Sequence, residues 1–112
     1  MTGKLTEIEE KAVKEFKEAV LRKFPGKIKT ILLYGSKARG DFHKESDIDV
    51  MVLIDEGDFE IRDQILDIAY GFFLKYEVLV SPRVINLKEY QQLTLWQTSF
   101  IKNTQRDGIS IG

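Results

Sequence analysis

Residues 29–54 read KTILLYGSKARGDFHKESDIDVMVLI, and the prediction of the fold starts from this stretch. Two apolar runs, residues 28–34 and residues 48–54, are separated by a polar segment that opens with Gly35 and Ser36. Apolar runs of this length, bounded by turn residues, are typical of strands that are buried on both faces. The stretch therefore predicts a strand, a turn into a short helix, a polar loop and a second strand.

Two aspartates, Asp47 and Asp49, enter the second predicted strand two positions apart. Side chains at i and i+2 of a strand point to the same face, so the two carboxylates should lie side by side. Such a pair of oxygen ligands suits a hard divalent cation such as Mg²⁺. Taken alone, the pair could instead be a polar strand entrance, with Ser46 or Asp47 capping a turn. An unpaired buried carboxylate is costly, and this favours the metal site for Asp49.

The Gly35-Ser36 turn supplies groups that bind phosphate. Gly35 has no Cβ to keep a phosphate away from the backbone, and free N–H groups at the start of a helix attract anions. The Ser36 hydroxyl and the Arg39 guanidinium would project from the same side of a helical turn. The alternatives are that Ser36 only caps the helix and that Arg39 pairs with Asp41 or Glu45 at the surface. A phosphate site beside a metal site predicts a nucleoside triphosphate bound with Mg²⁺.

The rest of the chain alternates helical and strand patterns. Capping signals at Thr6 with Glu9 and at Asn86 with Glu89 mark the starts of two helices. No repeat or linker divides the sequence, so we expect residues 1–112 to form one domain. The predicted fold class is α/β (α+β), a small mixed sheet with helices packed on it. The expected helices are 6–24, 36–40, 59–74, 87–93 and 99–106, and the expected strands are 28–34, 48–54, 76–80 and 109–111. Ser81 and Pro82 should stop the third strand, and residues 83–85 could continue it past a bend.

Composition excludes several classes of function. Cysteine is absent, which rules out disulfides and thiolate zinc sites, and a single histidine rules out multi-histidine metal sites. The chain has 17 Lys and Arg residues against 18 Asp and Glu residues, so a nucleic-acid-binding role is not expected. No apolar run reaches membrane-spanning length, and the N-terminus lacks the apolar core of a signal peptide. We therefore expect a cytoplasmic protein.

The two polar motifs together resemble the signature of a known superfamily. GSKARG at residues 35–40, followed by SDID at residues 46–49, is similar to the motif of the DNA polymerase beta-type nucleotidyltransferases. The short GSxARG form resembles the minimal (MNT) branch of that superfamily. The resemblance implies a polymerase beta-like fold, Asp47 and Asp49 as metal ligands, Mg²⁺ as cofactor and ATP as substrate.

The resemblance further implies a third acidic residue on a neighbouring strand, where it helps to activate the attacking hydroxyl. Glu77, in the third predicted strand, is the best match and would join Asp47 and Asp49 as a catalytic and metal-binding residue. The family usually has Asp at this place, so the carboxylate would lie one methylene further out. Glu77 could also be a charge on an edge strand. Asp55 and Asp67 are the other candidates if the third strand is placed wrongly.

Similar minimal proteins transfer AMP from ATP, or are paired with a helical HEPN-domain protein. In such pairs the HEPN-domain protein is a ribonuclease toxin, and the nucleotidyltransferase is the antitoxin that modifies it. The function implied by the resemblance is Mg²⁺-dependent transfer of AMP to a hydroxyl acceptor, a tyrosine of a HEPN-domain partner. Two alternatives stand beside it. One is a catalytically weak module that only binds such a partner, and the other is a nucleotidyltransferase for a small molecule that works with an accessory subunit. The sequence leaves the oligomeric state open, a homo-oligomer included.

Overall fold

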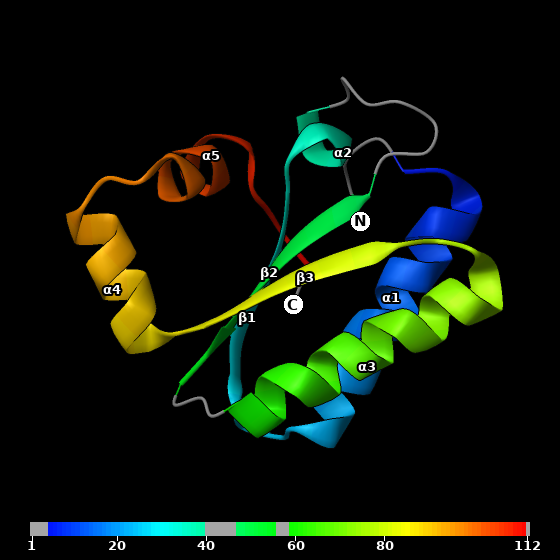
Figure 1. Ribbon diagram of the computed structural model, residues 1–112. Coiled ribbons are helices and arrows are strands. Elements are labelled where there is room, and N and C mark those ends of the chain that lie inside the picture. Colours follow the sequence, from blue (N-terminus) through cyan, green and yellow to red (C-terminus); the bar gives the residue numbers. More distant parts are fainter. Residues whose placement is uncertain (1–4, 40–46, 56–58, 112) are drawn as a thin grey trace.

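The computed structural model describes residues 5–39, 47–55 and 59–111, and Figure 1 shows helices on both sides of a sheet. None of the helices among these residues is long and apolar enough to cross a membrane. In chain order the elements are α1 (Glu7–Lys23), β1 (Ile28–Tyr34), α2 (Ser36–Arg39), β2 (Ile48–Ile54), α3 (Phe59–Tyr76), β3 (Val80–Asn86), α4 (Leu87–Leu95), α5 (Ser99–Asp107) and β4 (Ile109–Ser110).

The sheet is mixed, with the strand order β3-β2-β1-β4. Strand β1 runs antiparallel to β2 and to β4, and β2 runs parallel to β3. The register sets Tyr34 opposite Asp49 and Asp49 opposite Ser81. Directly opposed residues share a face, so these three residues form one row across one face of the sheet. The predicted mixed sheet with helices packed on it is confirmed.

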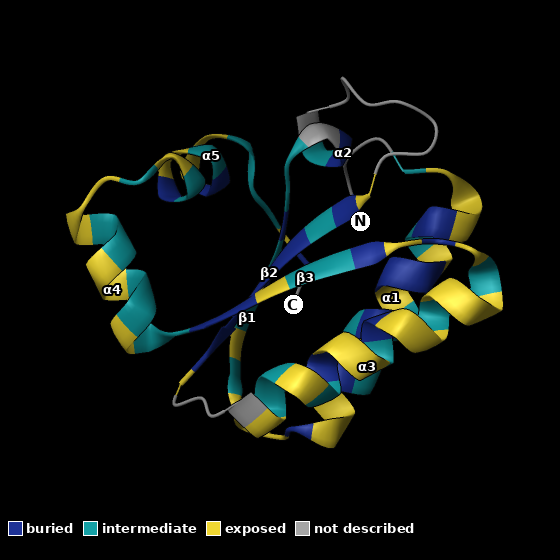
Figure 2. Ribbon diagram, in the orientation of Figure 1, coloured by how far each residue is buried: buried dark blue, intermediate teal, exposed yellow. Residues whose placement is uncertain are grey.

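Both faces of the sheet are covered by helices, α1 and α3 on one face and α4 and α5 on the other (Figure 1). Alternation along β2 sends Val50 and Val52 into the larger core, with Phe16 of α1, and Met51 and Leu53 into a smaller cluster on the opposite face. Figure 2 shows the resulting dark blue band along the centre of the sheet. Burial on both faces is why the sequence of β2 is almost continuously apolar.

The two predicted capping boxes are present. At the start of α1, Thr6 N–H donates to Glu9 Oε1 at 2.9 Å and Glu9 N–H donates to Thr6 Oγ1 at 3.3 Å. At the start of α4, Glu89 N–H donates to Asn86 Oδ1 at 2.7 Å and Asn86 N–H donates to Glu89 Oε1 at 3.2 Å. Each box satisfies N–H groups that a first helical turn leaves without intrahelical partners.

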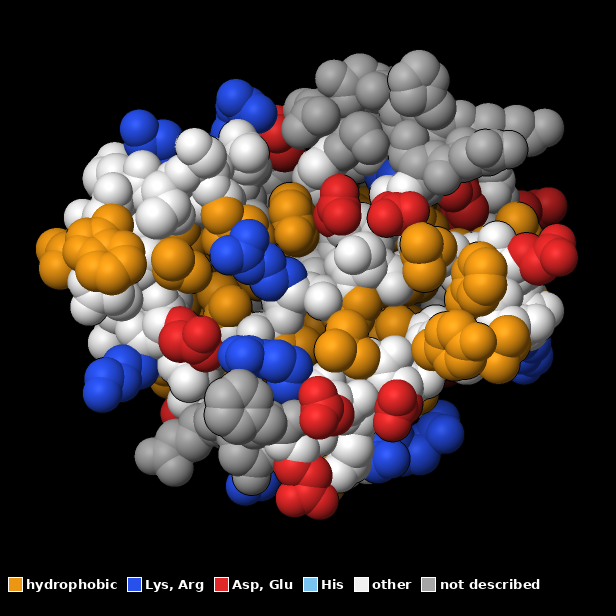
Figure 3. All heavy atoms as spheres, in the orientation of Figure 1, with side chains coloured by type: hydrophobic (Ala, Val, Ile, Leu, Met, Phe, Trp, Pro, Cys, Tyr) orange, Lys and Arg blue, Asp and Glu red, His pale blue; other side chains and the backbone are white. Residues whose placement is uncertain are grey.

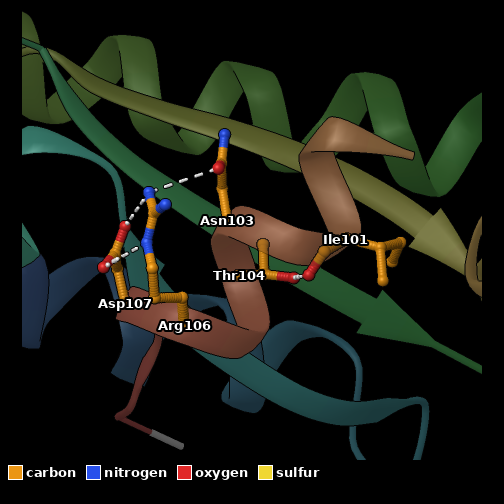
Figure 4. Close-up of polar contacts among 5 residues, drawn as sticks. All are labelled: Ile101, Asn103, Thr104, Arg106 and Asp107. Atoms are coloured by element: carbon orange, nitrogen blue, oxygen red, sulfur yellow. Dashed lines mark hydrogen bonds and ion pairs between the residues drawn. The ribbon is translucent and has the colours of Figure 1, made fainter. Parts of the chain in front are cut away.

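Helix α5 carries Phe100, which packs into the smaller cluster. Figure 4 shows polar contacts that are internal to this helix. The buried Thr104 hydroxyl donates to the Ile101 carbonyl at 2.9 Å, and Arg106 Nε and Nη2 donate to the two carboxylate oxygens of Asp107 at 3.1 and 3.0 Å. These contacts are local to α5, and the first of them satisfies the buried Thr104 hydroxyl.

The third strand begins later than predicted, and this corrects the position of Glu77. Helix α3 continues to Tyr76, whose ring packs against the larger core. Glu77 then adopts a left-handed backbone, with φ 56°, and donates its N–H to the Phe73 carbonyl at 2.8 Å. This conformation is typical of the residue that ends a helix. Glu77 therefore ends α3 and is not part of a strand.

Strand β3 also runs through Ser81 and Pro82, the predicted stop, and includes the alternative continuation over residues 83–85. Proline has no N–H to donate to a neighbouring strand, so it is tolerated in outer strands. The strand order places β3 at an edge of the sheet. The prediction was wrong because the sequence alone does not reveal which strand occupies the edge.

Candidate active site

Gly35 and Asp49 come together where β1 ends and α2 begins. Gly35 has φ +79°, and a Cβ built on it would lie 2.5 Å from Asp49 Oδ2 and 3.3 Å from Asp49 Cγ. A side chain at this position would displace the carboxylate, so glycine is what allows Asp49 to lie against the backbone. The carboxylate is thereby held beside the turn that opens α2.

Asp47 stands at the same end of β2. Asp49 is half-buried while the other residues of the strand are buried, and Asp47, directly before the strand, is exposed. The next residue, Ile48, donates its N–H to the Leu79 carbonyl at 2.9 Å, which fixes the start of β2 next to the segment that leads into β3. Mg²⁺ prefers one or two carboxylates and keeps several waters of its own. Two accessible carboxylates beside a glycine turn fit such an ion.

Tyr34, Phe100 and Arg83 lie beside Asp49 on the same face. The Tyr34 and Phe100 rings meet edge to face with a centroid distance of 5.4 Å, and the Arg83 guanidinium carbon lies over the Phe100 ring, 4.1 Å from its centroid. Burial raises the pKa of the Tyr34 hydroxyl, the negative charge of Asp49 raises it further, and the positive charge of Arg83 opposes this shift. Asp49 and Arg83 are thus both within electrostatic reach of Tyr34.

Lys37 is a residue of this region that sequence reasoning missed. Only 1% of its side chain is exposed, and its Nζ lies 2.7 Å from Glu9 Oε2 of α1. The other oxygen of Glu9 accepts the Thr6 N–H in the capping box. Burial alone would raise the pKa of Glu9, but the Lys37 ion pair and the Thr6 hydrogen bonds together lower it. The pair ties α2 to the start of α1, and a lysine beside a turn gives no sequence signal of such burial.

The two other predicted nucleotide-binding residues, Ser36 and Arg39, have their backbone in α2. The Ala38 N–H donates to the Gly35 carbonyl at 3.1 Å and closes the first turn of this helix. The side chains of Ser36 and Arg39 lie outside the described part of the structure, as do residues 40–46. The phosphate contacts expected of Ser36 and Arg39 therefore stay predictions.

The structure does not bring Glu77 onto the strand beside β2. Glu77 is exposed at the end of α3, and β3, VSPRVIN, contains no Asp or Glu. Among the residues that the structure describes, no three Asp, Glu or His side chains gather closely enough to hold a metal ion. Asp55 follows the opposite end of β2 from Asp49, and Asp67 is exposed on α3. Among the described residues, then, β2 and the residue directly before it carry two carboxylates at this end of the strand, those of Asp47 and Asp49.

Two proteins of Methanocaldococcus jannaschii, both provisionally named protein adenylyltransferases, are similar to the chain. One is 39% identical over 100 residues, which cover 89% of this chain and 94% of the relative. The other is 34% identical over 100 residues, which cover 88% of this chain and 94% of the relative. The likeness therefore extends well beyond the short motifs.

Solved structures share the fold. A protein of Sulfolobus solfataricus, provisionally named a nucleotidyltransferase, is 23% identical with a TM-score of 0.59, and the match covers 93% of this chain and 82% of that one. A chain from a toxin-antitoxin crystal structure with AMP-PNP is 22% identical with a TM-score of 0.53, covering 87% of this chain and 70% of that one. At these identities the likeness shows the fold alone.

Residues 13–111 match a protein family described as "Nucleotidyltransferase domain". The match spans both motifs, together with all of the sheet. The superfamily resemblance indicated by GSKARG and SDID is confirmed by this match and by the curated relatives. The chain therefore belongs to the nucleotidyltransferase domain family.

Proposed function

We propose that the protein transfers AMP from ATP, in the presence of Mg²⁺, to a hydroxyl group of a partner protein. The contact between Asp49 and Gly35 is the main support, because it brings a carboxylate to the backbone turn that opens α2. A triphosphate bound with Mg²⁺ needs acidic ligands for the ion and donors for the phosphates at one place. Membership of the nucleotidyltransferase domain family supports the same reaction.

In this reaction the acceptor oxygen forms a bond to the α-phosphorus of ATP. The bond between that phosphorus and the bridging oxygen of pyrophosphate breaks, pyrophosphate leaves, and the hydroxyl proton passes to a base or to solvent. Asp47 and Asp49 would hold Mg²⁺, which when bound would neutralise charge on the phosphate oxygens. Asp49 would also hold the bound Mg²⁺ next to the Gly35 turn, because the Asp49 carboxylate lies against the backbone of that turn.

The turn after β1 would hold the phosphates. Gly35 would let the backbone approach them, and the Ser36 hydroxyl and the Arg39 guanidinium would donate to their oxygens. Lys37 would not contact the nucleotide, since its ammonium is buried and paired with Glu9. It would keep the turn in place by anchoring α2 to α1.

A protein acceptor is supported by the relatives. The two Methanocaldococcus jannaschii proteins are provisionally named protein adenylyltransferases, and one structural neighbour belongs to a toxin-antitoxin structure with AMP-PNP. We infer that the acceptor is a tyrosine of a HEPN-domain toxin and that this chain acts as its antitoxin. The resemblance of the GSKARG motif to minimal nucleotidyltransferases supports this finer assignment.

Incubation of the chain with Mg²⁺, ATP and a HEPN-domain protein from the same organism tests this function, with intact mass and peptide mapping as readouts. We expect the HEPN-domain protein to gain the mass of one or more AMP groups on tyrosine. Asp49→Asn should abolish the gain while the circular dichroism spectrum stays unchanged. An unmodified partner, with Mg-ATP binding retained, would contradict AMP transfer to this acceptor.

A second candidate function is a module that binds its partner and nucleotide with little catalysis. The composition of β3 favours it, because the strand beside β2 carries no acidic residue that could activate the acceptor hydroxyl. In this case the wild-type chain would bind Mg-ATP and the partner, and no AMP would be transferred. The mass measurement above separates the two functions.

A further inference from the structure

A groove runs along the open edge of β3, between α3 and α4. It has a volume of about 500 Å³, and its walls include Arg83 of β3, Leu66 of α3, Leu93 of α4, and Trp96 directly after α4. Leu66 is 44% exposed and Trp96 is 66% exposed, although both are large apolar side chains. Figure 3 shows orange hydrophobic side chains on either side of blue basic ones across the middle of this face. We call this feature the β3 groove.

The β3 groove lies on the acceptor side of the proposed site. Strand β2 has β1 on one side and β3 on the other, and the turn that would hold the phosphates follows β1. In an in-line displacement the attacking and leaving oxygens lie on opposite sides of phosphorus. With the pyrophosphate over the β1 side of Asp49, the acceptor hydroxyl must approach from the β3 side. Arg83 lies there, one same-face position beyond Ser81, which is opposite Asp49.

Arg83 is the charged group of this groove that is available to a partner. The guanidinium of Arg62 already forms an ion pair with Glu89 at 3.2 Å. Among the described residues no carboxylate forms an ion pair with Arg83, whose guanidinium lies over the Phe100 ring instead. Arginine stacked on a ring keeps in-plane N–H donors that match a carboxylate. The groove thus offers one positive charge between apolar side chains.

The edge of β3 does not favour the addition of a strand. Pro82, in the middle of the groove wall, has no N–H to donate to a neighbouring backbone. Side chains must therefore provide most of the recognition. The matching ligand is a segment with an apolar residue for the Leu66, Leu93 and Trp96 surface and an acidic residue for Arg83.

We propose that the β3 groove is the docking site of the acceptor protein, which presents its tyrosine from a segment carrying an apolar residue and an acidic residue that pairs with Arg83. This docking role rests on the proposed transfer of AMP to a protein. In this role the β3 groove would position the acceptor through charge and apolar contacts that do not involve Asp47 or Asp49. Arg83 is then a positioning residue.

Two fluorescein-labelled peptides test the docking role by fluorescence anisotropy without ATP, so that binding is read even if no AMP is transferred. Both contain one tyrosine and one leucine, and they differ only in having Asp or Lys at one position near the tyrosine. We expect the wild-type chain to bind the Asp peptide about fivefold more tightly, as a partly exposed ion pair allows. Arg83→Glu should reverse this preference, and Trp96→Ala should weaken the binding of both peptides.

Two exposed residues that do not line the β3 groove provide matched controls. Lys88→Glu on α4 changes the charge as Arg83→Glu does, and Leu95→Ala removes an exposed apolar side chain next to Trp96. Both should leave the binding of the two peptides unchanged. Equal affinity for the two peptides, binding of neither, or an unreversed preference in Arg83→Glu would overturn the docking role. So would weaker Mg-ATP binding by Arg83→Glu in calorimetry, since Arg83 would then belong to the nucleotide site.

Discussion

At the scale of single residues, the site depends on how closely the Asp49 carboxylate can approach the Gly35 backbone. Glycine is needed at position 35 for two reasons, its positive φ and the nearby Asp49 carboxylate, and a comparison of three glycines separates them. Gly35 combines a positive φ with the contact to Asp49, whereas Gly26 has φ +75° and no atom within 4 Å of a Cβ position. Gly71 in α3 also has no atom within 4 Å and lacks the positive φ. Backbone strain and steric contact can therefore be measured apart.

Alanine substitution of these glycines gives the first prediction, measured by chemical denaturation. Gly71→Ala should raise the free energy of unfolding by about 0.5–1 kcal/mol, because glycine is unfavourable in a helix interior. Gly26→Ala should lower it by about 1 kcal/mol through backbone strain. Gly35→Ala should lower it by about 2–3 kcal/mol and weaken Mg-ATP binding, because the contact with Asp49 adds to the strain. Equal effects at Gly26 and Gly35, with ATP binding intact, would contradict this account of the turn.

Glu77 gives the second prediction at this scale. Its left-handed backbone is one that glycine adopts without strain, so Glu77→Gly should raise the free energy of unfolding by up to about 1 kcal/mol. Because the exposed Glu77 ends α3 and does not lie on β3, AMP transfer should stay within about twofold of the wild-type rate, a change smaller than 0.5 kcal/mol in the barrier. A large loss of transfer in a stabilised Glu77→Gly protein would restore Glu77 as the third carboxylate.

At the scale of elements, the position of α2 depends on the ion pair between Glu9 and Lys37. Each Glu9 carboxylate oxygen has its own partner, since one accepts from Thr6 in α1's capping box and the other pairs with Lys37. A single side chain therefore connects the start of α1 to the turn that would hold the phosphates. Disturbing this pair should affect both folding and nucleotide binding.

A double-mutant cycle tests this connection. Glu9→Gln and Lys37→Met should each lower the free energy of unfolding by about 3 kcal/mol, because each breaks a buried ion pair. The double variant should lose clearly less than the sum of the single losses. Lys75→Met serves as the control, since Lys75 is 59% exposed in its pair with Glu15 and the change should cost less than about 1 kcal/mol. Additive losses at Glu9 and Lys37 would show that the two side chains are not coupled.

The Glu9 pair also predicts a pH dependence. The pKa of Glu9 in the folded protein lies below its ordinary value of 4.5, so folding favours the ionised carboxylate. Its contribution to stability is complete above pH 4.5 and is lost as the pH falls through the lowered pKa. The free energy of unfolding should therefore fall more steeply with acid in the wild type than in Glu9→Gln/Lys37→Met. Parallel acid profiles of the two proteins would contradict the lowered pKa.

Elements with strong local signals were predictable from the sequence, and those decided by tertiary context were not. The bounds of β1 and β2 and both capping boxes follow from local patterns. The bounds of β3 were misplaced for two reasons. Its start was set too early because Glu77 ends α3 in a left-handed conformation without being glycine, and its end was set too early because Pro82 is tolerated in this edge strand. Within the site, the places of Gly35 after β1 and of Asp49 in β2 followed from local patterns. The close approach of Asp49 to Gly35 and the burial of Lys37 depend on tertiary packing, which the sequence does not show.

At the scale of the whole molecule, the sheet order would place the two proposed reactants, ATP and the acceptor protein, on opposite sides of β2. The turn that would hold the phosphates and the β3 groove lie on opposite sides of β2, with Asp49 between them. Nucleotide binding and partner binding should therefore respond to different substitutions. Asp49 variants should lose Mg-ATP binding, and Arg83 variants should change only the choice of partner segment.

A site for Mg-ATP at Asp47 and Asp49, beside the Gly35 turn, can be tested by calorimetric titration of ATP into the purified chain with and without Mg²⁺. We predict that wild-type binding requires Mg²⁺, that Asp49→Asn abolishes it, and that Asp55→Asn, past the opposite end of β2, leaves it unchanged. Mg²⁺-dependent ATP binding of equal strength in Asp49→Asn and the wild type would contradict such a site.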